Sequence, residues 1–281
     1  EGPRADAAAL LWLSPAAAAD AGAWQVEHRT FAEVWASARK VAAGLRYMVG
    51  ARLRQAKTRS CDLGTDQGGK VGIAINEGPP LALVVLGVLL ADCIIVPLDP
   101  CDPGERIVGV MGDAGMDVVV AKDAAVKSNV DAAIACGSEA LAGNDQPLVV
   151  LATDLIGGLP GVLEPTGEAG CLLQAGDAVS HIYFTSGSTG RPKGCVVTHA
   201  SLASYCSAHN SVYNIGEDTI SFVASAHTFD PFLGDLVGTW AAGGCCAFAP
   251  RQHLLPRLGD LLLASGATHL KCTPSLFGTL V

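Results

Sequence analysis

Apolar and polar positions alternate along this chain with two different periods, which predict a repeating order of strands and helices. Between residues 70 and 121, short apolar runs typical of buried strands are separated by longer segments with helical spacing. The order strand, helix, strand favours a β-α-β unit with parallel strands. Strands are expected at 70–76, 93–97 and 118–121, and helices at 80–92 and 105–114.

The same alternation continues on both sides of this segment. Residues 24–26 predict a strand, and Phe31, Val34 and Val41 recur at helical spacing within a helix at 30–44. A strand that begins at residue 180 is expected to run into a loop that ends at 194. Further strands are expected at 148–152, 195–198, 220–225, 245–249 and 269–273, with helices from Ser201 onward, at 232–242 and at 257–266. Three polar or Ala/Gly-rich segments predict loops at 51–69, 123–147 and 157–177. The whole pattern predicts an α/β fold with α-β-α layers.

Composition narrows the class of protein. Half of the 281 residues are hydrophobic and the net charge is −9, so a large core is available and no nucleic-acid surface is expected. The apolar run 81–98 contains Asp92 and Pro97, which predicts a buried helix and strand and no membrane span. The ten cysteines form no Cys-x-x-Cys pair, so we expect reduced thiols, a cytoplasmic protein and no zinc site.

The segment 183–199 carries the clearest chemistry. Small hydroxyl side chains (Thr185, Ser186, Ser188 and Thr189) alternate with Gly187, Gly190 and Gly194, and Lys193 lies near the end of the run. Glycines allow close approach of the backbone, successive N–H groups form an anion nest, and a lysine adds a point charge. Pro192 precedes the lysine, unlike in a Walker P-loop. The segment predicts a loop that wraps a polyphosphate; the alternative is a flexible Gly/Ser linker.

This loop resembles the phosphate-binding signature of the adenylate-forming enzymes, which include acyl-CoA synthetases, luciferases and the adenylation domains of nonribosomal peptide synthetases. Residues 30–34, 89–100 and 229–231 resemble further motifs of the same family in the same order. The resemblance covers nearly the whole chain. It is strongest to plant-type acyl-activating enzymes related to the aminoadipate-semialdehyde-dehydrogenase-like and β-alanine-activating enzymes.

The resemblance implies roles for single residues. Residues 185–190, Lys193 and Gly194 would hold the β- and γ-phosphates of ATP, and Lys193 would assist catalysis. Asp230 would pair with a substrate ammonium group, although it also fits a helix N-cap followed by Pro231. His227 would either line the acyl pocket or be a core histidine. Lys271, near another pocket wall, would face an acidic end of the substrate.

The resemblance also implies an activity and its cofactors. We expect ATP-dependent activation of a carboxylic acid, such as the amino acids β-alanine or aminoadipate, as an acyl-adenylate. Mg²⁺ would accompany ATP without a metal ligand from this chain, and the acyl group would pass to the thiol of CoA or of phosphopantetheine on a carrier domain. The family's later motifs are not found before Val281. We therefore expect the N-terminal portion of an adenylation domain, divided at about residues 1–178 and 179–281, with the C-terminal domain absent.

Two functions remain open at this point. One is an enzyme fragment that has little activity alone. The alternative is a non-catalytic, truncated module that binds a nucleotide or a partner without turnover.

Overall fold

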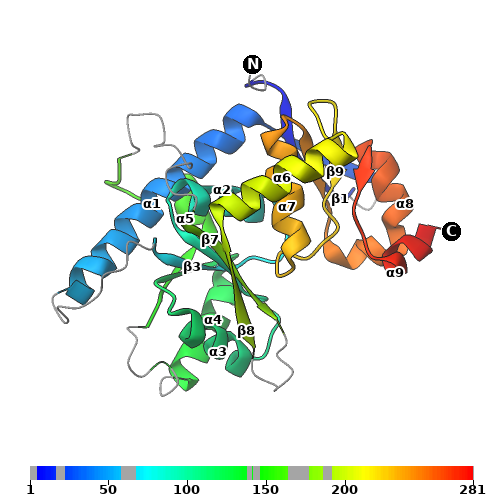
Figure 1. Cartoon of the computed structure of the whole chain (residues 1–281). Coiled ribbons are helices and arrows are strands. Elements are labelled where there is room, and N and C mark those ends of the chain that lie inside the picture. Colours follow the sequence, from blue (N-terminus) through cyan, green and yellow to red (C-terminus); the bar gives the residue numbers. More distant parts are fainter. Residues whose placement is uncertain are drawn as a thin grey trace. The chain divides into compact units, whose positions relative to one another are not determined.

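The computed structural model describes residues 5–16, 23–57, 68–137, 141, 146–163, 177–185 and 192–280. The chain forms two compact units that interleave along the sequence (Figure 1). The first unit comprises Glu1–Trp35, Glu77–Pro79 and Leu202–Val281, and the second comprises Ala36–Asn76 and Pro80–Ser201. These units do not coincide with the consecutive segments 1–178 and 179–281.

The second unit is built on a six-stranded sheet with the order β6-β5-β3-β4-β7-β8. All neighbouring strands are parallel except β7 and β8, which form an antiparallel pair. This confirms the parallel arrangement expected for residues 70–121. The strands are β3 (Lys70–Ala74), β4 (Ile94–Pro97), β5 (Val118–Ala121), β6 (Leu148–Leu151), β7 (Val179–Thr185) and β8 (Lys193–Thr198).

Helices cover both faces of this sheet, which confirms the α-β-α layering. On one face, α3 and α4 share a core with side chains of β3, β4, β5 and β7. The helices α1, α2 and α5 lie on the opposite face (Figure 1). Gly87 of α2 allows close packing, because a Cβ atom there would lie 2.4 Å from Cγ1 of Val41 in α1. The helices are α1 (Phe31–Lys57), α2 (Pro79–Leu90), α3 (Gly104–Ala114), α4 (Ala124–Cys136) and α5 (Ala152–Gly157).

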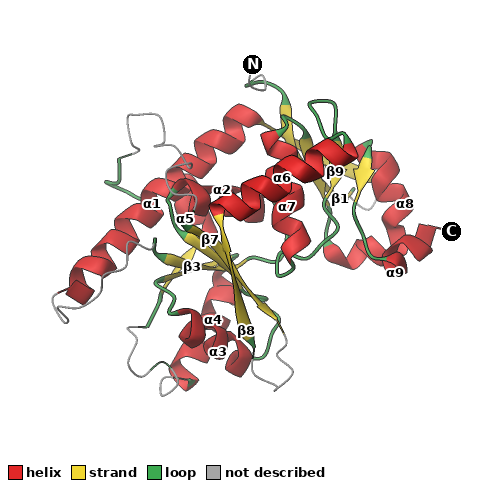
Figure 2. Ribbon diagram, in the orientation of Figure 1, coloured by secondary structure: helices red, strands yellow, loops and turns green. Residues whose placement is uncertain are grey.

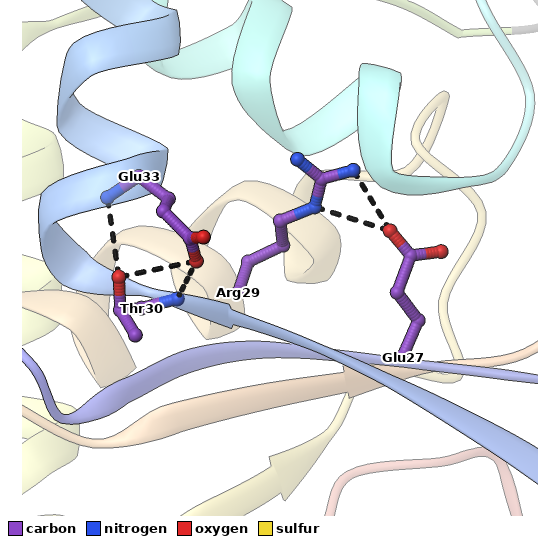
Figure 3. A network of polar contacts seen from close by, with 4 residues as sticks. All are labelled: Glu27, Arg29, Thr30 and Glu33. Atoms are coloured by element: carbon purple, nitrogen blue, oxygen red, sulfur yellow. Dashed lines mark hydrogen bonds and ion pairs between the residues drawn. The ribbon is translucent and has the colours of Figure 1, made fainter.

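The start of α1 is fixed by a capping box (Figure 3). The backbone N–H of Thr30 donates to the Glu33 carboxylate at 2.8 Å, and the N–H of Glu33 donates to Oγ1 of Thr30 at 3.3 Å. The bond from the Thr30 N–H, and a further one from the Thr30 hydroxyl to the same carboxylate at 3.1 Å, lower the pKa of Glu33. Nearby on β2 (Trp24–Thr30), Arg29 forms an ion pair with Glu27 at 2.8 Å.

The first unit contains a five-stranded sheet with the order β11-β9-β10-β1-β2, parallel except for the β1–β2 pair. Alternate residues of β10 face opposite layers: Cys245 and Ala247 belong to the core under α8, whereas Cys246 approaches Leu236 of α7. The strands are β1 (Ala8–Pro15), β2 (Trp24–Thr30), β9 (Ile220–Phe222), β10 (Cys245–Phe248) and β11 (His269–Leu270). The helices are α6 (His199–Tyr213), α7 (Asp230–Ala241), α8 (Leu254–Ser265) and α9 (Pro274–Phe277).

Several expectations for the connecting segments are wrong. The helix α1 runs on to Lys57, into a segment that we expected to be a loop, and α4 occupies much of the expected loop 123–147. Asp123 caps α4 by accepting a hydrogen bond from the N–H of Val126 at 2.9 Å. The strand β1 and the short helix α5 were not anticipated (Figure 2).

The long apolar run divides as expected into α2 and β4. Within the described ranges, none of the helices combines the length and the apolar character that a bilayer crossing requires.

The eight cysteines in the described ranges are free thiols. Cys93 is buried, whereas Cys195 is exposed on β8, the strand at the edge of its sheet.

Candidate functional site

The expected phosphate loop is bracketed by the β7–β8 hairpin. The strands β7 and β8 lie side by side (Figure 2). In the ladder, Thr185 at the end of β7 is opposite Lys193 at the start of β8. Oγ1 of Thr185 lies 3.5 Å from the carbonyl oxygen of Lys193, and both residues are exposed. The hairpin therefore places Thr185, which carries a hydroxyl group, beside Lys193, one at each end of the intervening segment.

The remaining loop residues divide into two groups. Ser186, Gly187, Ser188, Thr189 and Gly190 lie outside the described residues. Gly194 is described and faces Phe184 in the ladder. A Cβ atom at Gly194 would lie 3.1 Å from Cγ2 of Ile182 and 3.3 Å from the Phe184 ring, so glycine allows these side chains to pack over the strand.

The strand that leads into this loop is anchored by a buried histidine. His181 is only 4% exposed, and its Nδ1 atom lies 2.9 Å from Oγ of Ser180. Its ring packs edge-on against Tyr183 at 5.1 Å. Burial, with a smaller contribution from His199, lowers the pKa of His181 to about 4. The neutral imidazole is therefore part of the core at neutral pH.

The expected substrate residues lie in the first unit. Asp230 is exposed and is the first residue of α7, whose N-cap position is occupied by Phe229. The N-cap role considered for Asp230 is therefore wrong, and no side chain caps this helix. His227 is only 4% exposed and so is buried in this unit.

A cavity of about 490 Å³ opens in the same unit. It is formed by parts of α6, β9, α7, β11 and α9, together with the residues that follow β11. Asp235 and Thr239 reach it from α7, and Lys271 reaches it from the end of β11. Neither Asp230 nor His227 is among the residues that line it.

An ion pair lies in the wall of this cavity. Nζ of Lys271 donates to Oδ1 of Asp235 at 3.0 Å and also to the hydroxyl of Tyr205. Burial raises the pKa of the Asp235 carboxyl, and the Lys271 ammonium opposes that shift. Burial also acts to lower the pKa of Lys271, but its hydrogen bonds to Tyr205 and Asp235 outweigh burial and raise it. Lys271 thus faces a carboxylate of its own chain.

Three aromatic rings line up along α6 next to this pair. Tyr205 stacks on His209 with ring centroids 5.5 Å apart, and His209 lies 4.7 Å from Tyr213. The Lys271 ammonium lies 5.2 Å from the centre of the Tyr205 ring, within range of a cation–π contact. Burial and then the positive charge of Lys271 lower the pKa of His209, so this ring is neutral at neutral pH.

A metal site is not apparent in the ranges that the structure describes. There, His, Cys, Asp and Glu side chains form no group of three or more that could hold an ion. The described residues therefore offer no ligand set for a resident Mg²⁺.

Comparison with known proteins identifies the family. The model of the family described as AMP-binding enzyme matches residues 14–281. The chain belongs to the AMP-binding enzyme family. A curated relative, the nonribosomal peptide synthetase vlms of Lecanicillium sp, is 28% identical over 225 residues, which are 80% of this chain and 2% of that protein. The synthetase ecdA of Aspergillus rugulosus is 30% identical over 212 residues, 74% of this chain and 3% of that protein.

Solved structures agree with this assignment at the level of the fold. ATP-bound MatB from Rhodopseudomonas palustris superposes with a TM-score of 0.71 at 20% identity, over 99% of this chain and 48% of that chain. A nonribosomal peptide synthetase, FmoA3, gives a TM-score of 0.67 over 98% of this chain and 24% of its own. This member of the AMP-binding family thus spans only a small part of the synthetases it matches.

The sequence predicts that Lys271 faces an acidic end of the substrate, but it does not predict the pairing of Lys271 with Asp235. The signal for that pairing is Asp235 itself, a charged residue within the apolar segment Phe232–Ala241. Burying a carboxylate in such a helix costs free energy unless the charge is paired, so Asp235 predicts a cationic side chain beside it.

Proposed function

We propose that the complete protein activates an amino acid with ATP. In this reaction a carboxylate oxygen attacks the α-phosphorus of ATP, the bond from that phosphorus to the bridging oxygen breaks, and pyrophosphate leaves. The product is an acyl-adenylate, whose carbonyl is then attacked by a thiol with release of AMP. The observation that carries the proposal is the pairing of Thr185 with Lys193 across the hairpin in a chain of the AMP-binding family.

The hairpin supports a role in holding the polyphosphate. Lys193 is exposed at the start of β8, where its ammonium group is accessible to a phosphate oxygen. The hydroxyl of Thr185 lies beside it, and residues 186–190 bring further hydroxyls and glycines. In this proposal Lys193 acts by stabilising charge on the leaving pyrophosphate rather than by transferring a proton. The Ser186, Ser188 and Thr189 hydroxyls donate further hydrogen bonds.

The names of relatives support an amino acid as the substrate. The curated relatives are nonribosomal peptide synthetases, and structures similar to this chain include VinN with L-aspartate and a synthetase bound to AMP and glycine. Asp230 is exposed at the first turn of α7, where its carboxylate is accessible to an ammonium group. We keep it as the candidate partner of the substrate ammonium and His227 as a buried residue that supports this site. The substrates β-alanine and aminoadipate, and the plant-type relationship, remain predictions from the sequence.

The acceptor is proposed on the same basis. Nonribosomal peptide synthetase relatives favour phosphopantetheine on a carrier domain of the same full-length chain over free CoA. Mg²⁺ is expected to enter with ATP.

The test is amino-acid-dependent exchange of pyrophosphate into ATP by the native protein. We expect Lys193→Ala to slow exchange by about ten- to a hundredfold, the effect of losing one charged hydrogen bond. Lys127→Ala is the matched control, because Lys127 lies on α4 and forms an exposed ion pair with Asp131, which contributes little to stability. An unchanged rate in Lys193→Ala would remove this lysine from the mechanism. Nucleotide binding without exchange by any amino acid would favour the non-catalytic module.

A further inference from the structure

The wall of the cavity beside α7 contains a carboxylate oxygen that has no hydrogen-bond partner among the described residues. Asp235 is only 6% exposed, and among the described residues its Oδ2 atom is buried without a hydrogen-bond partner. Buried polar atoms are nearly always hydrogen-bonded in native proteins, so this oxygen calls for a partner from outside the described chain.

The Lys271 ammonium supplies the complementary atom. An ammonium group has three N–H donors, and those of Lys271 are directed in part to Oδ1 of Asp235 and to the Tyr205 hydroxyl. One donor therefore remains, and 38% of the Lys271 side chain is exposed. The cavity wall thus has a spare donor on Lys271 close to a spare acceptor on Asp235.

The sign of the local charge limits what can occupy this position. A ligand carboxylate would accept from Lys271 but would lie beside the Asp235 carboxylate. A ligand ammonium would donate to Asp235 but would lie beside Lys271. Like charges at such distances are unfavourable in a partly buried site, whereas a neutral group with both a donor and an acceptor satisfies both residues.

We infer that the cavity binds a neutral polar group, a carboxamide or a hydroxyl, whose oxygen accepts from Lys271 and whose N–H or O–H donates to Oδ2 of Asp235. That the whole ligand is an amino acid rests on the proposed function. On that basis, the cavity holds the side chain of the substrate, and the substrate is an amino acid with a carboxamide or hydroxyl side chain.

The test is calorimetric titration of the 281-residue chain, without nucleotide, with four L-amino acids of similar length: glutamine, glutamate, lysine and methionine. Glutamine is expected to bind about tenfold more tightly than each of the others, the discrimination expected from one hydrogen bond to a charged group. Tighter binding of glutamate, lysine or methionine, equal binding of all four, or no binding of any would overturn the inference.

Two near-isosteric variants reverse the preference in opposite directions. Asp235→Asn leaves the Lys271 charge unpaired and should favour glutamate, whereas Lys271→Met leaves the Asp235 charge unpaired and should favour lysine. The double variant carries neither charge and should bind none of the charged amino acids better than methionine. It tests the role of the pair if a single variant, with its unpaired buried charge, does not fold. The control Asp131→Asn removes an exposed carboxylate on α4 and should keep the preference for glutamine.

The result is separable from the proposed function. Selective binding of glutamine without ATP binding or pyrophosphate exchange would reject adenylation but keep the cavity assignment. Exchange that does not discriminate between glutamine and glutamate would keep adenylation and reject the cavity assignment. Variants that leave the preference for glutamine unchanged would also reject the role of the Asp235–Lys271 pair.

Discussion

Acid should destabilise the protein through His181, the buried histidine on the strand that leads into the proposed phosphate loop. Its pKa is lowered to about 4 from 6.5, chiefly by burial. Below pH 6.5 the unfolded chain binds a proton that the folded chain excludes, so stability falls as the pH falls from 6.5 to about 4 and no further below it. The difference of about 2.5 pH units corresponds to about 3 kcal/mol, at about 1.4 kcal/mol per unit.

The assay is urea unfolding followed by circular dichroism between pH 7 and pH 4. Wild type is compared with His181→Gln, whose amide can still bond to Ser180 but does not titrate. Carboxylates titrate in both proteins, so the difference between their pH profiles isolates His181. We expect wild type to lose up to about 3 kcal/mol more than the variant over this range. The control His28→Gln removes an exposed histidine of β2 and should behave as wild type. Parallel pH profiles for wild type and His181→Gln would refute the reasoning.

Two further predictions concern stability and use the same unfolding assay. Gly87→Ala should destabilise the chain by about 1–3 kcal/mol, because the new methyl group would meet the stiff Val41 side chain at 2.4 Å; Gly109→Ala, where a Cβ meets nothing within 4 Å, should instead be stabilising. A loss of stability in both variants would show that space is not the cause. Thr30→Ala should cost about 1 kcal/mol by removing the N-cap of α1, and Thr30→Ser should restore it; equal stability of all three proteins would contradict the capping role.

The parallel sheet could be predicted because its signals are local. The strands β3, β4 and β5 are almost entirely buried, and each is separated from the next by a helix, so their sequences read as apolar runs of strand length. Gly115 marks the end of α3 and takes φ 65°, a conformation that favours glycine. Here local propensity, burial and end signals all indicate the same structure.

The missed elements have weak or distant signals. Only Val130 and Ile134 of α4 are buried, so the helix has almost no apolar face that a periodicity could reveal. The one usable sign was Asp123, three residues before Val126, as an N-cap. The strand β1 pairs with β10 in a register that joins Leu10 to Cys246, a contact between residues far apart in the sequence. Pairing of that kind cannot be deduced from local pattern.

The candidate site divides in the same way. The sequence indicates two short strands on either side of a glycine-rich segment, and the structure adds their antiparallel pairing, in which β8 begins already at Lys193. The pairing of Asp235 with Lys271 has no local signal, because it joins the middle of α7 to the end of β11. Lys271 alone indicated an acidic substrate, and only its contact with Asp235 shows that its charge already has a partner.

The measurement that tests the central claim most directly is equilibrium binding of ATP and AMP to the 281-residue chain and to its Lys193→Ala variant. If the loop after β7 holds the polyphosphate, wild type should bind ATP about tenfold or more tightly than AMP, the effect of a charged hydrogen bond to the additional phosphates. Lys193→Ala should lose that preference while its affinity for AMP stays unchanged. Equal affinities of wild type for ATP and AMP, or an undiminished preference for ATP in Lys193→Ala, would contradict the account.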